Sequence, residues 1–255
     1  MTEPLRITSR DNPLLKRLRL LARDNTAYRK WGQVWLEGDH LCRALLARGG
    51  TPAMAVFCDS ESHKAQADYG FLATKKVVVP DALMQDLSGL ESAACMGFVV
   101  DLPTSAAVQP QAPTVVLDRV QDAGNVGSIL RSAAAFGYTQ VLAIKGTAAL
   151  WSPKVLRAGM GAHFGLRLME GLSPHDLAAL AVPILVTSSH HGEWVHKGAL
   201  PWPCAWVMGH EGQGVSEDIL SGAVQSIRIA QPGGEESLNV AAAAAICLHA
   251  SAAKP

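Results

Sequence analysis

The sequence lacks the features that mark membrane, secreted and zinc-binding proteins. No apolar run approaches the ~20 residues that a helix needs to cross a bilayer, and the start, MTEPLRITSRDNP, carries acids and no apolar signal core. The five cysteines are odd in number, widely spaced and mostly set in apolar runs, and no two form a CxxC pair. We therefore expect a cytoplasmic protein with reduced thiols, no bound metal and no membrane partner.

Common nucleotide-binding and hydrolytic signatures are also missing. The sequence has no GxxxxGK(S/T) phosphate loop, and no GxGxxG opens the first strand–helix turn of its second half. No GxSxG elbow is present, which argues against a hydrolase that uses Ser237 with one of the nine histidines. His190 and His191 are adjacent, and adjacent residues do not share a helix face, so they make a poor metal pair.

The net charge of zero hides an uneven distribution. Residues 1–31 contain eight Lys or Arg and three acids, whereas the rest of the chain contains 14 basic and 19 acidic residues. A basic N-terminal arm suits a nucleic-acid backbone, and its candidate contact residues are Arg10, Lys16, Arg17, Arg19 and Arg23. The alternative is a solvated amphipathic helix, because Leu14, Leu18 and Leu21 form an apolar stripe at i, i+4 and i+7.

A proline-containing linker divides the chain. The segment LPTSAAVQPQAP at 102–113 has few charges and no periodicity, so we place domains at 1–105 and 114–255, joined by 106–113. In the first domain, apolar runs at 34–36, 54–58, 77–79 and 97–101 alternate with helical stretches around 39–48, 61–69 and 81–90. This alternation is typical of a small α/β domain.

The second domain shows the pattern of a parallel sheet. Strands are predicted at 114–118, 140–144, 183–187, 204–208 and 226–230, with helical segments between them. Apolar runs without alternation fit parallel strands that are covered on both faces. The predicted fold class is α/β with a mostly parallel sheet.

The first of three polar segments is LDRVQDAGNVGSILRSAAAFG at 117–137. A strand ends near Asp118, and Asn125 is a plausible N-cap for a helix that runs to about Phe136. Arg131 lies off the apolar face of this helix, near an end that favours anions. An ordinary surface arginine is the alternative.

The second segment is VMGHEGQGVS at 207–216. Its glycines, Gly209, Gly212 and Gly214, follow a strand and enclose one acid, Glu211. Glycines allow a backbone to approach a ligand closely. The alternative is an ordinary glycine-rich turn.

The third segment is IRIAQPGGEESLNVAAAA at 227–244. Ile229 is predicted to close a strand, and Ser237 is a plausible N-cap for an alanine-rich helix. Ser237 and Asn239 would then stand at a helix N-terminus, available to a substrate oxygen or phosphate, although Ser237 could simply cap the helix.

The order NVGSILR, GHEGQG and SLNV resembles the three motifs of the SpoU (TrmH-like) class of the SPOUT superfamily, which are S-adenosylmethionine-dependent RNA 2′-O-ribose methyltransferases. The resemblance covers about 113–250. The stretch SPKVLRAGMGAHFGL at 152–166 is similar to the family's connector after its second strand. Residues 5–105 resemble the small L30e-like substrate-binding domain that many ribosomal RNA methylators carry.

This resemblance implies a C-terminal SPOUT domain with a deep trefoil knot, which ordinary folds essentially lack. It also implies a homodimer through the knotted domain. In the family, main-chain groups of the second and third motifs hold the methyl donor. The matching residues here are Gly209, Ile229 and Leu238, with Glu211 and Gly212 beside them.

The resemblance also implies catalytic roles. Arg131 matches the arginine that serves the reacting hydroxyl. Because a guanidinium is effectively always protonated, we interpret Arg131 as a ligand of the adjacent phosphate or developing alkoxide, and leave open whether it is a true base. Asn125, Glu211, Ser237 and Asn239 match positions that orient Arg131, the ribose and the donor.

Three positions depart from the family's usual pattern. Ala230 and Gln231 stand where Pro-Met is common, and His210 replaces a smaller residue. These changes alter the rim of the donor pocket but remove no polar group with an assigned role.

The sequence therefore predicts 2′-O-ribose methylation of structured RNA with S-adenosylmethionine as cofactor. The N-terminal domain favours 23S ribosomal RNA, and transfer RNA is the alternative within the same class. A non-catalytic knotted RNA-binding assembly factor is a further alternative, against which the intact Asn125, Arg131, Glu211 and Asn239 argue.

Overall fold

The computed structural model describes residues 3–69, 75–90, 92–103, 107–188, 191–223, 225–234 and 237–253. Its contacts divide the chain into two compact units. The first unit comprises Met1–Thr104 with Trp151–Phe164, and the second comprises Ser105–Leu150 with Gly165–Pro255. In the described part of the chain, no helix is both long and apolar enough to cross a membrane. The predicted domain boundaries and the L30e likeness of the first domain stay predictions.

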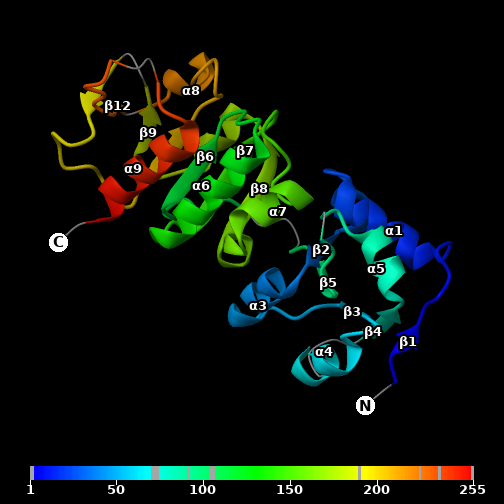
Figure 1. Cartoon of the computed structure of the whole chain (residues 1–255). Coiled ribbons are helices and arrows are strands. Elements are labelled where there is room, and N and C mark those ends of the chain that lie inside the picture. Colours follow the sequence, from blue (N-terminus) through cyan, green and yellow to red (C-terminus); the bar gives the residue numbers. More distant parts are fainter. Residues whose placement is uncertain are drawn as a thin grey trace. The chain divides into compact units, whose positions relative to one another are not determined.

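The first unit contains a five-stranded mixed sheet (Figure 1). The strands run in the order β1 (Leu5–Arg6), β4 (Lys75–Val79), β3 (Met54–Cys58), β5 (Met96–Asp101) and β2 (Gln33–Glu37). The pairs β1–β4 and β4–β3 are parallel, whereas β5 is antiparallel to both β3 and β2. The four apolar runs predicted for this domain are therefore confirmed as strands.

The helices of the first unit include the predicted amphipathic one, α1 (Pro13–Arg23). The Asn12 side chain accepts a hydrogen bond from the Leu14 N–H at 2.9 Å and caps this helix. Its buried face includes Leu15, Leu18 and Leu21, whereas Leu14 is half-buried. The apolar stripe is therefore confirmed at Leu18 and Leu21, but Leu15 rather than Leu14 is its buried first residue. The other helices are α2 (Tyr28–Trp31), α3 (Asp39–Ala47), α4 (Ser62–Tyr69), α5 (Asp81–Leu87), α7 (Pro153–Gly159) and η1 (Ala162–Gly165).

The second unit contains a seven-stranded sheet in which every described pair is parallel. The order is β10 (Glu193–Trp194), β12 (Gln225–Arg228), β9 (Ile184–Thr187), β11 (Ala205–Met208), β6 (Thr114–Leu117), β7 (Gln140–Ile144) and β8 (Arg167–Leu172). The α/β class with a mostly parallel sheet is confirmed. The trefoil knot stays a prediction.

Apolar strand faces and two long helices build the core of this unit. Val116, Leu142, Val186 and Val207 of four neighbouring strands are buried together. The helices α6 (Ala123–Ala135) and α9 (Val240–Ala252) lie side by side (Figure 1), and the shorter α8 (Glu217–Leu220) and η2 (Pro174–Ala179) complete the unit. The sequence did not predict β8 or β10, because β8 is only partly buried and β10 has 2 residues.

The parallel sheet explains why the three polar segments meet. They follow β6, β11 and β12 respectively. Since the carboxyl ends of parallel strands lie at one edge of a sheet, the loops after these strands leave from the same edge. That edge is where open α/β sheets bind their ligands.

Candidate active site

The loop after β6 enters helix α6 at Asp122, one turn earlier than the sequence suggested. The Asp122 carboxylate accepts a hydrogen bond from the Asn125 N–H at 2.8 Å, and the Asp122 backbone is extended. The prediction that Asn125 caps the helix was therefore wrong. Asn125 stands inside the first helical turn, which leaves its side-chain amide available for contacts with other loops.

The Glu211 carboxylate, from the loop after β11, binds this helix entrance. It accepts hydrogen bonds from the backbone N–H groups of Gln121 and Asp122, each at 3.1 Å, and from Asn125 Nδ2 at 3.1 Å. Partial burial raises the pKa of Glu211, but the hydrogen bonds from Asn125, Gln121 and Asp122 outweigh it, so the pKa lies below its usual value. The carboxylate therefore stays ionised at neutral pH and joins the first two segments.

Asn239 joins the third segment to the same network. Its Nδ2 donates to Asn125 Oδ1 at 2.9 Å, while its own Oδ1 accepts from the N–H groups of Ala241 (2.9 Å) and Ala242 (3.2 Å). Asn239 is thus the N-cap of α9, and the prediction that Ser237 caps it was wrong. The side chains of Glu211, Asn125 and Asn239 form one continuous chain across segments far apart in the sequence.

The glycine-rich segment after β11 is a tight turn. A Cβ on Gly209 would lie 2.4 Å from the carbonyl carbon of Gly214, so only glycine fits. His210 and Gly214 exchange two backbone hydrogen bonds, of 3.0 and 2.9 Å. The His210 ring closes the turn from inside, because Nδ1 accepts from the N–H groups of Gly212 (3.0 Å) and Gln213 (3.2 Å).

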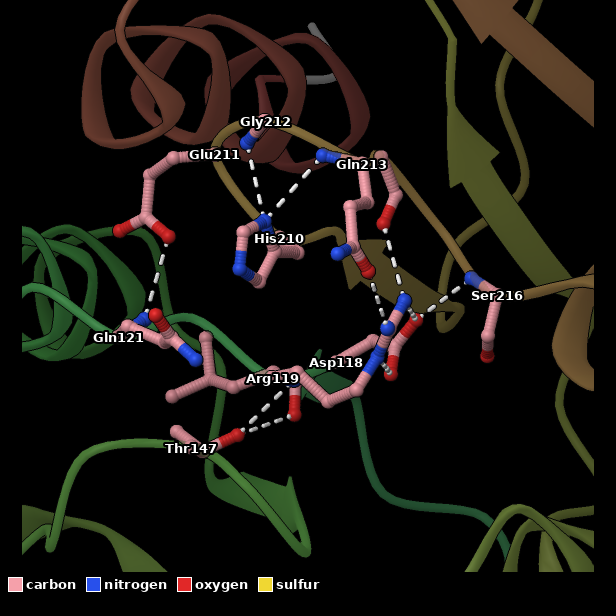
Figure 2. A network of polar contacts seen from close by, with 11 residues as sticks. Asp118, Arg119, Gln121, Thr147, His210, Glu211, Gly212, Gln213 and Ser216 are labelled. Atoms are coloured by element: carbon pink, nitrogen blue, oxygen red, sulfur yellow. Dashed lines mark hydrogen bonds and ion pairs between the residues drawn. The ribbon is translucent and has the colours of Figure 1, made fainter.

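Two residues that the sequence analysis gave no role, Asp118 and Arg119, support this turn from the end of β6 (Figure 2). Arg119 Nε lies 3.0 Å from Asp118 Oδ1, and Arg119 Nη1 donates to Gln213 Oε1 at 2.8 Å. Asp118 Oδ2 accepts from the Ser216 N–H at 2.7 Å. The only signal in the sequence was an acid and a base directly after an apolar strand, which is too common to identify a site.

The remaining candidate residues of the second unit are not joined to this network. Arg131 is exposed on α6 and makes no hydrogen bond or ion pair within the described part of the chain. Ser237 and Leu238 are exposed just before α9, and Ile229 is half-buried just after β12. The predicted strand end at Ile229 was wrong by one residue, since β12 ends at Arg228.

Buried polar atoms without partners lie in the loops that follow β11 and β12. Among the described residues, Ser216 Oγ and Gln231 Oε1 are shielded from solvent and have no hydrogen-bond partner. Such atoms are costly unless a ligand or water satisfies them. Together with the exposed apolar side chain of Leu238, they fit a ligand that has both polar groups and an apolar face. Within the described residues, no cluster of His, Cys, Asp or Glu could hold a metal.

In the first unit, most of the candidate RNA-contacting residues of the arm are engaged within the protein. Arg10 donates two hydrogen bonds, of 3.0 and 2.9 Å, to the Asp86 carboxylate, and Arg19 Nε lies 2.8 Å from the same group. The hydrogen bond from Arg10 lowers the pKa of Asp86. Arg23 donates to the backbone carbonyls of Asp86 (2.7 Å) and Ser88 (3.1 Å). These arginines hold α1 against α5.

Lys16 is less constrained. Lys16 pairs at 3.0 Å with Asp11, and both side chains are more than half exposed, so solvent screens this pair strongly. Arg17 is half-buried. A hollow on α1 is lined by Lys16, Arg19, Leu20, Arg23, Asp24 and Asn25, which combines positive charge with an exposed leucine.

Comparison with known proteins places this geometry in context. Residues 112–249 match the profile of the SpoU rRNA Methylase family. The chain is 30% identical to an uncharacterized tRNA/rRNA methyltransferase of Synechocystis, over 95% of this chain and 92% of that protein. It is 33% identical to the 23S rRNA (guanosine(2553)-2′-O)-methyltransferase RlmP of Bacillus subtilis, over 53% of this chain and 56% of that protein.

The alignments with solved structures span residues of both units. An RNA 2′-O ribose methyltransferase aligns with a TM-score of 0.77 and 27% identity, covering 97% of this chain and 98% of the other. The AdoMet-bound rRNA methyltransferase from Sinorhizobium meliloti aligns with a TM-score of 0.83 and 23% identity, covering 96% of each chain. Because the second structure is only 23% identical, its similarity shows the fold alone.

Proposed function

The chain belongs to the SpoU rRNA methylase family, and from that premise we propose that it transfers a methyl group from S-adenosylmethionine to a ribose 2′-hydroxyl of structured RNA. Ribosomal RNA, and 23S RNA in particular, is the proposed substrate. The observation that carries the proposal is the chain of hydrogen bonds from Glu211 through Asn125 to Asn239, because it joins all three family segments at the ligand-binding edge of the sheet.

The residues around this edge fit the methyl donor. The turn at Gly209–Gly214 offers backbone groups at close range and Leu238 offers an apolar surface, while Ser216 Oγ and Gln231 Oε1 lack a partner among the described residues. When bound, S-adenosylmethionine supplies a methyl group on a positively charged sulfur. The proposed donor contacts are Gly209, Glu211, Gly212, Ile229 and Leu238.

The proposed task of Arg131 is to activate the hydroxyl. A neutral hydroxyl is a weak nucleophile until its proton is drawn away. The guanidinium of Arg131, exposed and without a hydrogen bond or ion pair to the described residues, is proposed to bind the phosphate next to the ribose or the developing alkoxide. Stabilising the alkoxide lowers the pKa of the hydroxyl, while Arg131 itself stays protonated.

The other polar residues have a positioning role in this proposal. Glu211 and Asn125 fix the α6 entrance that carries Arg131, and Asn239 fixes the α9 entrance beside it. Ser237, exposed before α9, is the proposed contact of the ribose or its phosphate. Orientation of this kind supplies several kcal/mol of rate enhancement in enzymes. An intact network of this kind also argues against a non-catalytic RNA-binding protein.

Two further parts of the proposal concern the RNA and the assembly. Ribosomal RNA is favoured over transfer RNA because RlmP, at 33% identity, methylates 23S rRNA according to its name, and because the first unit carries the basic hollow on α1. The proposed assembly is a homodimer through the second unit, and the proposed location is the cytoplasm.

Transfer of labelled methyl tests the proposal. Ribosomal and transfer RNA are purified separately from cells that lack the protein, and each is incubated with the enzyme and labelled S-adenosylmethionine. We expect label in ribosomal RNA, recovered as an alkali-resistant 2′-O-methyl dinucleotide. Label confined to transfer RNA would change the substrate class. No donor binding at all would overturn the proposal in favour of the non-catalytic protein.

A further inference from the structure

Arg119 has an unusual backbone. Its φ is 60°, in the left-handed region that residues with a side chain avoid, and it is one of two non-glycine residues with positive φ in the described part of the chain. Thr147 stabilises this conformation, because its Oγ1 accepts from the Arg119 N–H at 3.1 Å and donates to the Leu117 carbonyl at 2.9 Å. Strained residues of this kind concentrate at functional sites.

The strained backbone directs the Arg119 side chain at the glycine-rich turn (Figure 2). Nη1 donates to Gln213 Oε1 at 2.8 Å, and Nη2 makes a longer contact of 3.4 Å with the Gly214 carbonyl. That carbonyl also accepts from the His210 N–H at 3.0 Å, which closes the turn. The guanidinium therefore contacts the turn at Gly214, where the hydrogen bond from His210 closes it.

Asp118 holds the end of the same turn at Ser216. Its side chain is 1% exposed. Oδ1 accepts from Arg119 Nε at 3.0 Å, and Oδ2 accepts from the Ser216 N–H at 2.7 Å and, at 3.5 Å, from Arg119 Nη2. A buried carboxylate needs a partner charge, and Arg119 supplies it. Losing the guanidinium therefore weakens the contacts with Gln213 and Gly214 directly and leaves the anchor of Ser216 without its counter-charge.

We propose that Arg119 is a positioning residue that holds the turn at residues 209–216 in its donor-binding shape before the donor arrives. This inference rests on the proposed function, since the turn is the proposed donor site. A turn that is already ordered loses less conformational entropy on binding. Arg119 thus sets the affinity for S-adenosylmethionine, while the chemistry of the transfer depends on other groups.

Arg119→Asn tests the proposal with little disturbance of the backbone, because asparagine tolerates the left-handed conformation. In the enzyme without donor, we expect amide hydrogen exchange at Gly214 and Ser216 to become roughly tenfold faster. In turnover assays, we expect the donor KM to rise roughly tenfold and kcat at saturating donor to change by less than about twofold. The midpoint of thermal unfolding should fall, because the buried Asp118 carboxylate loses its counter-charge, but exchange elsewhere in the second unit should rise much less than at Gly214 and Ser216.

Three further variants serve as comparisons. Arg119→Lys keeps the charge opposite Asp118 but loses the forked geometry, so it should restore part of the affinity. Gln213→Ala removes one acceptor, and its effect should be less than additive with Arg119→Asn. Arg43→Asn removes a different Arg–Asp pair, in which Arg43 Nε lies 2.6 Å from Asp39, and should leave exchange at the turn and the donor KM unchanged. If Arg119→Asn fails to fold, Arg119→Gly repeats the test.

The outcomes separate the two proposals. Unchanged exchange at Gly214 and Ser216 with an unchanged donor KM would overturn the role of Arg119, and so would a general loss of stability with exchange raised throughout the second unit. A wild-type enzyme that binds no S-adenosylmethionine would instead overturn the proposed function. The exchange measurement needs no donor, so it remains interpretable in that case.

Discussion

The N-terminal arm of the first unit and the sheet edge of the second unit both carry polar residues that the sequence analysis identified, but their side chains have different kinds of partner. Arg10, just before α1, and Arg19, on α1, pair with Asp86, a neighbour within the same unit. At the sheet edge, Glu211, Asn125 and Asn239 come from three separate segments and contact one another. The first set is largely satisfied by the protein itself, whereas the second lies at the sheet edge where open α/β sheets bind their ligands.

The difference shows which kind of sequence signal identifies a site. A cluster of like charges on one helix is compatible with a nucleic-acid surface and with ordinary helix packing, because the partner residues, here Asp86 and the carbonyls of α5, are invisible in local composition. Three polar loops that each follow a parallel strand are more specific, since the sheet forces them to one edge.

The largest expected effect comes from Arg131, the exposed arginine on α6 that we propose as the residue activating the hydroxyl. We expect Arg131→Ala to lower kcat by roughly 10²-fold or more, because a hydrogen-bond donor that stabilises developing negative charge contributes that much in other enzymes. Donor affinity and the unfolding midpoint should stay unchanged, since Arg131 makes no hydrogen bond or ion pair with the described residues. The measurement is single-turnover methyl transfer at saturating donor and RNA.

Arg131→Lys is the matched comparison for this prediction. Lysine keeps the charge but cannot form the planar fork that binds phosphate with two hydrogen bonds. A partial recovery of turnover would support phosphate or alkoxide binding. Wild-type turnover in Arg131→Ala would show that Arg131 has no catalytic role. The proposed active site would then have no residue to activate the hydroxyl.

The second prediction concerns Glu211, which links the loops. We expect Glu211→Gln to destabilise the second unit by about 1 kcal/mol at pH 7, because the amide nitrogen donates where the carboxylate accepted and the partly exposed site is screened by solvent. Urea unfolding of the wild type and the variant at several pH values measures the difference.

The pH dependence of that difference follows from the lowered pKa of Glu211. The ionised form is favoured in the folded state, so the stabilisation is fully present above the usual carboxyl pKa of about 4.3. It is lost as the pH falls through the lower pKa of the folded protein. The gap between the wild type and Glu211→Gln should therefore close below about pH 4. A constant gap would contradict the network.

Much of the fold was predictable because the apolar runs are short, continuous and separated by turn residues. The runs at 54–58 and 140–144 are strands with the predicted bounds. The fold class followed from their lack of alternation. Where burial is partial, as in β8, the apolar pattern fades and the strand was missed.

The site was predictable only in part. Asn125, Glu211 and Asn239 were identified by resemblance, and the structure brings them into contact. The helix caps were misplaced because Asp122 and Asn125, or Ser237 and Asn239, are equally good capping residues, and only the backbone geometry decides between them. Arg119 was given no role because its contacts with Gln213 and Gly214 span more than 90 residues of sequence.

The third prediction tests whether the arm has any RNA-binding capacity beyond its own packing. Lys16 has the most exposed pairing, with Asp11, and should be free to exchange it for a phosphate. We expect Lys16→Ala to weaken RNA binding roughly threefold and to reduce the salt slope by about 1, without changing kcat. Filter binding at several salt concentrations measures both. An unchanged salt slope would assign the arm a purely structural role.

The smallest effect is expected from Asp86→Asn, which removes the acidic partner of the arm instead of one of its basic residues. Asp86 neutralises Arg10 and Arg19, so removing its charge leaves both arginines available to phosphate and adds one positive charge to the arm. We expect RNA affinity to rise roughly twofold at low salt, with the gain lost at high salt, while the first unit unfolds at a slightly lower temperature because α1 is held less firmly against α5. The two changes have opposite signs, so the same substitution separates charge from packing. A fall in RNA affinity would mean that Asp86 serves RNA binding by positioning the arginines, and the arm would then be an organised site like the sheet edge.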